Sequence, residues 1–191
     1  MREKDETKRR AIRDAAVLEV IEGGLTGASM GRIAKRAGVS PGTIYLYFPS
    51  KEELLQQIYL EIKTELHHQI MAGFNKSDTS TLNIKRIWFA LFEYAREHPS
   101  DFVFSEYVAA AQLLDETRKP EVEAMAIEVA TILNTAIEDG TLRRVPISAL
   151  TAVLIAPALQ LGRRAILTNE AITSDTLDNT FDMIWRGIVA S

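Results

Sequence analysis

The sequence contains no cysteine among its 191 residues, which excludes disulfide bonds and thiolate metal sites. This absence fits a reducing compartment, and we expect a cytoplasmic protein. Residues 1–6 are mostly charged and lack the apolar core of a signal peptide. The long apolar run at 145–161 contains two prolines and is short for a membrane span, so we interpret it as a buried helix.

Strand and catalytic patterns are also missing. Apolar residues recur at helical spacing and do not alternate over more than a few positions, so the sequence predicts an all-α protein. There is no Gly-rich phosphate loop. His67 and His68 are neighbours and point to different sides of a helix, so they cannot share a metal as an i, i+4 pair. We expect that the protein is not an enzyme and that it binds no metal or other cofactor.

The net charge of −4 is distributed unevenly. Residues 1–51 carry ten Lys or Arg and six Asp or Glu, a net of +4, whereas residues 52–191 carry twelve and twenty, a net of −8. The segment 29–51 contains four basic residues and no acidic one. A basic patch on an acidic protein is typical of a nucleic-acid-binding face, although a solvated helix face would have the same composition.

Residues 38–55 contain the signals for a very short helix between two sharp boundaries. Gly38 suits the left-handed conformation that closes a helix. Ser40 can cap the next helix, and Pro41 fits its first turn. Pro49 ends that helix, and Ser50 with Glu53 forms a capping box for another. A helix of about seven residues is roughly 10 Å long and is too short to be stable alone, so other helices must hold it in place. A recognition helix that enters a DNA major groove has this form.

In this segment the sequence resembles the TetR family of transcriptional regulators. The matching residues are Ile33-Ala34, Ala37-Gly38-Val39-Ser40, Gly42-Thr43, Tyr45, Tyr47-Phe48 and Ser50-Lys51-Glu52, with Ile12, Ala16 and Gly24 upstream. The resemblance covers roughly residues 7–66. It implies a helix-turn-helix DNA-binding head at 1–50 and a helical effector-binding and dimerisation domain at 51–191.

The resemblance also implies which residues meet DNA. Thr43 can reach a base edge or phosphate, Tyr45 and Tyr47 can bind phosphates, and Lys51 lies at a helix N-terminus suited to a phosphate. A half-buried core position is the alternative for both tyrosines, whereas we expect Ile44 and Phe48 in the core. The full predicted interface is Ser29, Arg32, Lys35, Ser40, Pro41, Gly42, Thr43, Tyr45, Tyr47 and Lys51.

Four helices are predicted in the first part of the chain, at about 7–22, 30–37, 41–48 and 50–73, followed by a polar linker at 75–80. Five more follow, with apolar stripes at 84–95, 100–114 and 122–137 and helices at 147–167 and from Ser174 onward. The segment 100–114 is apolar almost all round, which predicts burial on most sides. We expect an apolar effector pocket lined by Trp88, Phe92, Phe104, Tyr107, Val108, Met125 and Val129, although any one of these fits a core position.

The last two helices are expected to form the dimer interface, through Leu159, Arg163, Leu177, Phe181, Ile184, Trp185 and Ile188. The family resemblance implies a homodimeric repressor on a pseudo-palindromic double-stranded DNA operator, released by a small molecule. The alternatives are an architectural DNA binder without an effector and a small-molecule-binding or enzymatic helical protein. The sequence leaves open the operator, the effector, the regulated genes and the choice between repression and activation.

Overall fold

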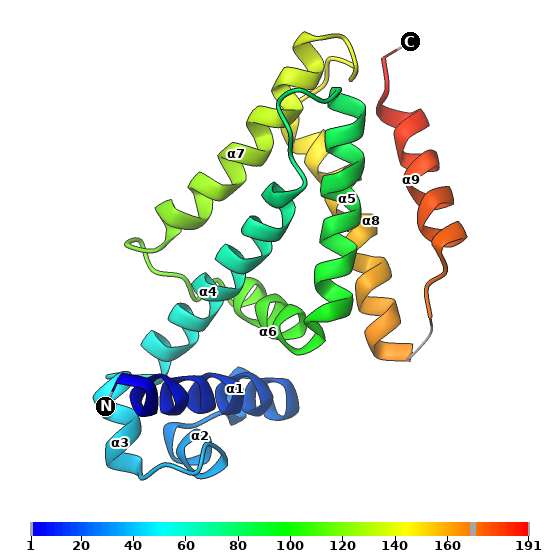
Figure 1. Ribbon diagram of the computed structural model, residues 1–191. Helices are drawn as coiled ribbons and strands as arrows, with labels where there is room; N and C mark the ends of the chain where they lie inside the picture. The colour runs from blue at the N-terminus through cyan, green and yellow to red at the C-terminus, as the bar shows by residue number, and fades with distance from the viewer. Residues whose placement is uncertain (1, 169–170, 191) are drawn as a thin grey trace. The chain divides into compact units, whose positions relative to one another are not determined.

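A computed structural model describes residues 2–168 and 171–190, with side chains from Glu6 onward. These residues form nine α-helices, which confirms the predicted all-α class (Figure 1). The helices are α1 (Arg2–Gly27), α2 (Met30–Arg36), α3 (Pro41–Tyr47), α4 (Lys51–Ala72), α5 (Ser80–Glu97), α6 (Pro99–Ala110), α7 (Lys119–Glu138), α8 (Ile147–Thr168) and α9 (Ser174–Ile188). They divide into two compact units, residues 1–63 with 100–121 and residues 64–99 with 122–191.

The first unit has a small core beneath the short helices α2 and α3. Ile12, Ala16 and Val20 of α1 are four residues apart on one face of the helix, and all three are buried, as are Ile33 of α2 and Ile44 of α3. The α1 backbone leaves the helical conformation at Gly24, where φ is +68° and ψ is 176°. This break lies two residues after the predicted helix end at about residue 22, although one further turn continues to Gly27.

Helix α6 belongs to this first unit and is shorter than predicted. It ends at Ala110 instead of continuing to residue 114, and Gln112 takes a φ of +51° in the loop that follows. The apolar composition of this segment does not reveal the stop, because no Gly or Pro marks it. Phe102, Phe104 and Val108 are buried, but 41% of Tyr107 is exposed, so the helix is covered on fewer sides than its composition predicts.

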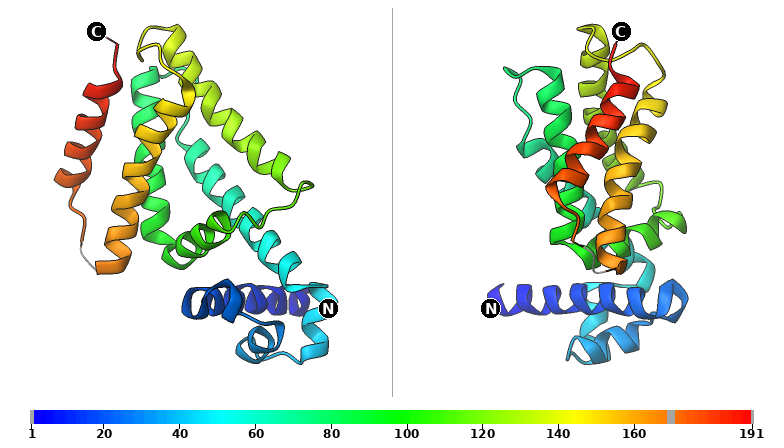
Figure 2. Two further views of the ribbon diagram at one scale, coloured as in Figure 1. Left: turned by 180° about the vertical axis from the view of Figure 1, so that it is seen from behind. Right: turned by 90° about the vertical axis from the view of Figure 1, so that its right-hand side faces the viewer.

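The second unit packs α5, α7, α8 and α9 around one apolar core (Figure 2). All six residues of the predicted α5 stripe are buried: Ile84, Ile87, Trp88, Leu91, Phe92 and Ala95. Helices α5 and α8 approach closely at Gly162, where an added Cβ would lie 2.5 Å from the Cβ of Ala95. Leu142, after α7, forms an isolated antiparallel bridge with Val189, after α9.

Helix α8 is long and apolar enough to cross a membrane by length and composition, with 22% of its apolar window buried. Its buried residues Leu150, Leu154, Ala158 and Gly162 follow each other at four-residue spacing. This spacing places them on one side of the helix, which packs against α5. The apolar run therefore supplies one wall of the core of the second unit, while Val153 and Leu167 are 44% and 68% exposed.

Candidate nucleic-acid interface

The short helix α3 is held by caps at its start and by core residues on one side. The Ser40 hydroxyl accepts a hydrogen bond from the backbone N–H of Thr43 at 3.1 Å, and Pro41 occupies the first turn. Gly38, with φ +68°, closes α2 before it. Ile44 and Phe48 are 0% and 2% exposed, which confirms them as core residues. The helix is therefore fixed to the scaffold through one face and exposed through the other.

The predicted interface residues lie along α2, α3 and the start of α4. Ser29, Arg32, Lys35, Ser40, Pro41, Gly42 and Tyr45 are exposed, whereas Thr43, Tyr47 and Lys51 are half-buried. Ser29 also caps α2, since its hydroxyl accepts from the backbone N–H of Arg32 at 3.3 Å. The Thr43 hydroxyl lies 2.8 Å from that of Ser40, so it is held near the helix N-terminus.

Leu46 is a candidate contact that the sequence analysis missed. It is 84% exposed on α3, next to Tyr45, which is 55% exposed. A leucine standing in solvent on a helix of this kind can make an apolar contact with a thymine methyl group in the major groove. Its position two residues after the buried Ile44 was the available signal, because residues two apart on a helix lie on different faces.

The arginines of α2 are bound to acidic residues of α1. Arg32 Nε donates to Glu19 at 2.6 Å, and Arg36 Nε donates to the other oxygen of Glu19 at 2.7 Å. Arg36 also pairs with Glu22. The hydrogen bond from Arg32 has the largest effect on the Glu19 carboxyl and helps to hold its pKa below the usual value, although burial acts in the opposite direction.

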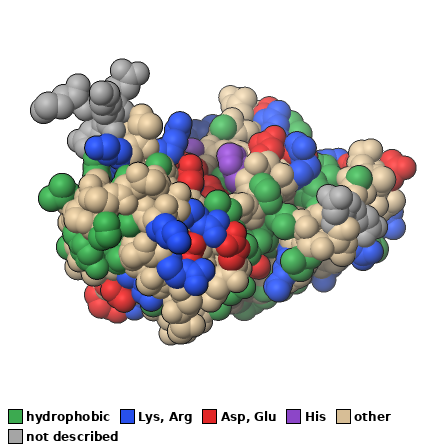
Figure 3. All heavy atoms as spheres, turned by 90° about the horizontal axis from the view of Figure 1, so that it is seen from below, with side chains coloured by type: hydrophobic (Ala, Val, Ile, Leu, Met, Phe, Trp, Pro, Cys, Tyr) green, Lys and Arg blue, Asp and Glu red, His purple; other side chains and the backbone are tan. Residues whose placement is uncertain are grey.

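These pairs weaken the basic patch that the sequence predicts. Lys and Arg side chains gather on this face together with Asp and Glu side chains (Figure 3). Within the described residues, Lys35 makes no ion pair and is exposed, so it is better placed than Arg36 to neutralise a phosphate. The acidic partners come from α1, ten or more residues upstream, and the local composition of 29–51 could not reveal them.

Lys51 has a structural role besides the phosphate contact predicted for it. Its ammonium donates to the backbone carbonyls of Leu25 and Ala28 at 3.1 and 3.2 Å. These bonds tie the start of α4 to the end of α1 and to the turn that follows it. Ser50 caps α4 by accepting from the backbone N–H of Glu53 at 3.1 Å, while the Glu53 carboxylate pairs with Arg118.

Family models match almost the whole chain. The model described as "Bacterial regulatory proteins, tetR family" matches residues 12–58, and "Tetracyclin repressor-like, C-terminal domain" matches residues 59–190. The chain belongs to the TetR family. It is therefore a DNA-binding transcriptional regulator of the helix-turn-helix type, which confirms the resemblance seen in the sequence.

Known proteins resemble the chain to different extents. A TetR family transcription regulator from Marinobacter aquaeolei VT8 has a TM-score of 0.90 at 26% identity over 100% of both chains. The nucleoid occlusion factor SlmA of Haemophilus ducreyi is 34% identical over 93 residues, 46% of each protein. The fatty acid metabolism regulator protein of Bacillus subtilis is 48% identical over 50 residues, 26% of each. The matches to these two named relatives thus span half of their length or less.

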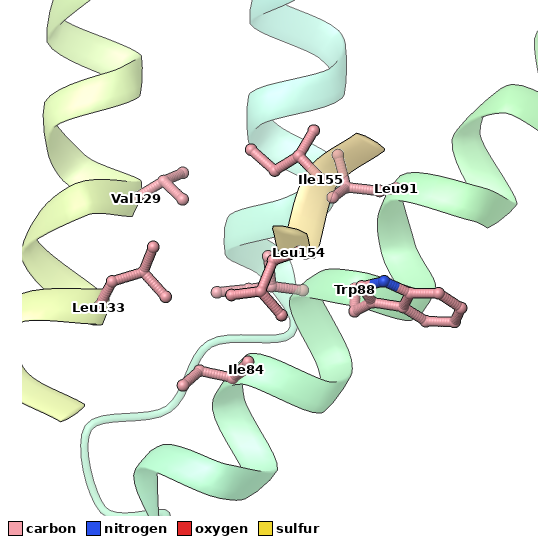
Figure 4. Close-up of a pocket in the computed structure, with 8 residues that line it drawn as sticks. Ile84, Trp88, Leu91, Val129, Leu133, Leu154 and Ile155 are labelled. Carbon is pink, nitrogen blue, oxygen red and sulfur yellow. The ribbon is translucent and has the colours of Figure 1, made fainter. Parts of the chain in front are cut away.

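The residues predicted for the effector pocket are distributed over both units. Phe104, Tyr107 and Val108 belong to the first unit, and Trp88, Phe92, Met125 and Val129 belong to the second. Trp88 and Val129 line a common apolar cavity of about 20 Å³ with Leu91, Leu133, Leu154 and their neighbours (Figure 4). The indole N–H of Trp88 is buried and has no hydrogen-bond partner within the described residues.

The residues predicted for the dimer interface differ in exposure. Leu177, Phe181 and Ile188 are buried in the core of the second unit, where the ring of Phe181 lies 5.6 Å from that of Trp88. Leu159, Ile184 and Trp185 are half-buried, and Arg163 is exposed. Sequence periodicity shows which face of a helix is apolar, but it cannot separate residues that the protomer covers from residues left at its surface.

Proposed function

We propose that this TetR-family chain is a cytoplasmic homodimeric repressor that binds a pseudo-palindromic operator and is released by a small molecule. The exposed face of α3 is the observation that carries the proposal. Tyr45 and Leu46 stand in solvent on a helix whose opposite side is locked into the core by Ile44 and Phe48. A rigid helix with an exposed aromatic and an exposed aliphatic side chain is suited to reading base edges in the major groove.

The exposed apolar residues of α8 and α9 support the homodimer. Val153 and Leu167 are separated by 14 residues, close to four helical turns, and therefore lie on one side of α8. Met183 of α9 is 66% exposed. A two-fold interface buries the same patch on both subunits, and pairing these two helices with their copies gives a four-helix arrangement.

The small-molecule step is supported by the buried indole N–H of Trp88. An unpaired buried donor costs free energy, which a ligand with a hydrogen-bond acceptor would remove. The 20 Å³ cavity beside it is too small for such a ligand, so binding requires the surrounding helices to move apart. Release of DNA follows only if the ligand binds the DNA-free conformation more tightly than the DNA-bound one.

The proposal is tested by selecting binding sites from random duplex DNA. We expect a consensus with two-fold symmetry and half-sites about 34–36 Å apart or somewhat more. Leu46→Ala should weaken binding to the selected site by about 1–2 kcal/mol, because it removes apolar surface buried against the base, and it should leave binding to random DNA unchanged. Leu82→Ala, at an exposed leucine of α5, is the matched control and should leave both affinities unchanged.

Lys35→Ala should have the opposite signature, because a phosphate contact carries no sequence information. It should weaken selected and random DNA alike and reduce the slope of the salt dependence by about one. A selection without symmetry, or with equal affinity for random DNA, would contradict the repressor and favour an architectural DNA binder.

A further inference from the structure

A cavity of about 540 Å³ lies in the second unit between the end of α4, the turn before α5, and α7. This volume lies within the range of about 300–1,000 Å³ that is typical of small-molecule sites. The cavity shares no lining residue with the apolar cavity at Trp88. It is therefore a separate place at which the second unit can hold a ligand.

One part of the lining is apolar. Met71, in the last turn of α4, and Phe74, two residues after the end of that helix, are half-buried and pack against the core of the second unit. Ile132 of α7 is 8% exposed and belongs to that core. These three side chains offer a surface for a hydrocarbon chain or ring, and the face of Phe74 can also attract a cation.

Two threonines of α7 contribute only hydrogen-bond acceptors to the cavity. The Thr131 hydroxyl donates to the carbonyl of Ile127 at 2.8 Å, and the Thr135 hydroxyl donates to the carbonyl of Thr131 at 3.0 Å. A hydroxyl has one proton and two lone pairs, so both oxygens keep acceptor capacity after these bonds. Thr131 and Thr135 are one turn apart and both line the cavity.

The lining also contains two carboxylates. Glu128 lies one turn before Thr131, and one of its oxygens is 2.9 Å from Nε2 of His67. Its side chain is 59% exposed and can accept further hydrogen bonds. Asp78 pairs with Arg86 at 2.5 Å. Charged acceptors and neutral threonine acceptors therefore lie at the same cavity.

Two of the lining donors, those of Asn83 and Ser80, have partners within the protein. The Asn83 amide donates to the carbonyl of Asn75 at 2.9 Å, which holds the turn before α5. The Ser80 hydroxyl donates to Asp139. Lys76 is a cation in the lining, but it is exposed on the turn and its long side chain can extend into water. Acceptors thus dominate the fixed polar surface.

We propose that this cavity binds an organic cation, namely an ammonium group attached to an apolar body. The ammonium donates to Glu128 and to the threonine oxygens, and the apolar body covers Met71, Phe74 and Ile132. This binding site goes beyond the proposed repressor function and does not require it, because the cation binds the protein without DNA.

The proposal is tested by titration calorimetry of the full chain with three probes that share one ten-carbon chain. The probes are decylammonium, decanoate and decan-1-ol, each used below the concentration at which it forms micelles. We expect decylammonium to bind at least about tenfold more tightly than the other two, because hydrogen bonds to a charged acceptor favour the charged donor. Equal or tighter binding of decanoate would show that Lys76 directs the site, and it would overturn the proposal.

Two variants locate the site. Glu128→Gln removes the charge and Thr131→Val removes one acceptor at nearly constant volume, and each should weaken decylammonium binding, Glu128→Gln by about tenfold. Glu138→Gln is the matched control, since Glu138 is an exposed carboxylate of α7 outside the cavity lining. It should leave the affinity unchanged.

Absence of decylammonium binding would overturn the proposal, as would binding that both site variants, Glu128→Gln and Thr131→Val, leave unchanged. Operator binding is measured separately on the ligand-free protein. A protein that binds decylammonium at Glu128 but selects no operator would contradict the proposed repressor function alone, and the reverse result would contradict the cation site alone.

Discussion

Glu19 shows how single residues set the charge of the DNA-binding head. It is 4% exposed and accepts hydrogen bonds from Arg32 and Arg36, so two of the four basic residues in the segment 29–51 already have an anionic partner. Because the folded state lowers the pKa of Glu19, its ionised form favours folding. That contribution is present above the unfolded pKa and is lost as the pH falls through the lower folded pKa.

Glu19→Gln should therefore lower the free energy of unfolding at pH 7, by about 1–2 kcal/mol, because one charged acceptor of two arginines is replaced by a neutral amide. The difference from the unmodified protein should shrink as the pH falls through the folded pKa, where Glu19 itself becomes protonated. Chemical denaturation of both proteins at a series of pH values below 7 measures this difference in the free energy of unfolding. Glu22→Gln, at a side chain that is 53% exposed, should change stability by less than about 0.5 kcal/mol.

In the DNA-binding head, the sequence predicted the structural role of a residue where that role depends on neighbouring residues in the chain. Gly38, Ser40 and Pro41 act on their immediate neighbours, and the structure shows the caps that the sequence predicts. The hydrogen-bond acceptors of Arg32 and Lys51 could not be predicted from neighbouring residues. They lie 13 to 26 residues away and meet only because α1, α2 and α4 pack together.

At the scale of helices, the apolar stripes predicted the number and order of the elements, but not where every element ends. The stripe of α5 is buried as predicted, since 3.6-residue periodicity identifies the face turned to the core. The end of α6 was missed because no glycine or proline follows Ala110. Two hydrogen bonds from Arg13 to Asp101, at 3.1 and 2.7 Å, join α1 to α6 across 88 positions of the sequence.

The close approach of α5 and α8 gives a prediction about packing. Gly162→Ala should destabilise the protein by about 1–3 kcal/mol, because its new Cβ would overlap the Cβ of Ala95. Exchanging the two side chains, as Ala95→Gly with Gly162→Ala, should recover part of this loss because one methyl group remains at the contact. Thermal or chemical denaturation of both single variants and the double variant measures the coupling. Additive effects in the double variant would show that the two positions do not meet.

At the scale of the whole molecule, the two units include segments that are far apart in the sequence. Residues 100–121 pack with the helix-turn-helix head, although they follow α5 of the other unit. Gln56 of α4 accepts from the backbone N–H of Asp115 at 2.9 Å, and Arg118 pairs with both Glu53 and Asp115. The division at residues 50 and 51 drawn from sequence stays a prediction, since local patterns do not show which distant segments join the head.

The proposed homodimer leads to a prediction about assembly. Met183→Asp should shift the protein from dimer to monomer in sedimentation and should reduce operator affinity with it, because a charge would be buried in the interface. Ile127→Asp is the matched control, since Ile127 of α7 is 63% exposed and lies outside α8 and α9. It should remain a dimer. A monomeric unmodified protein at micromolar concentration would contradict the interface.

The two tryptophans of the chain, Trp88 and Trp185, both belong to the second unit. Trp88 is buried, and Trp185 is half-buried with its ring stacked on Phe181 at 5.7 Å. Tryptophan fluorescence therefore reports the unfolding of the second unit directly, whereas circular dichroism at 222 nm reports the helices of both units. If the two signals change at different temperatures, the head and the second unit unfold separately; coincident changes indicate one cooperative transition.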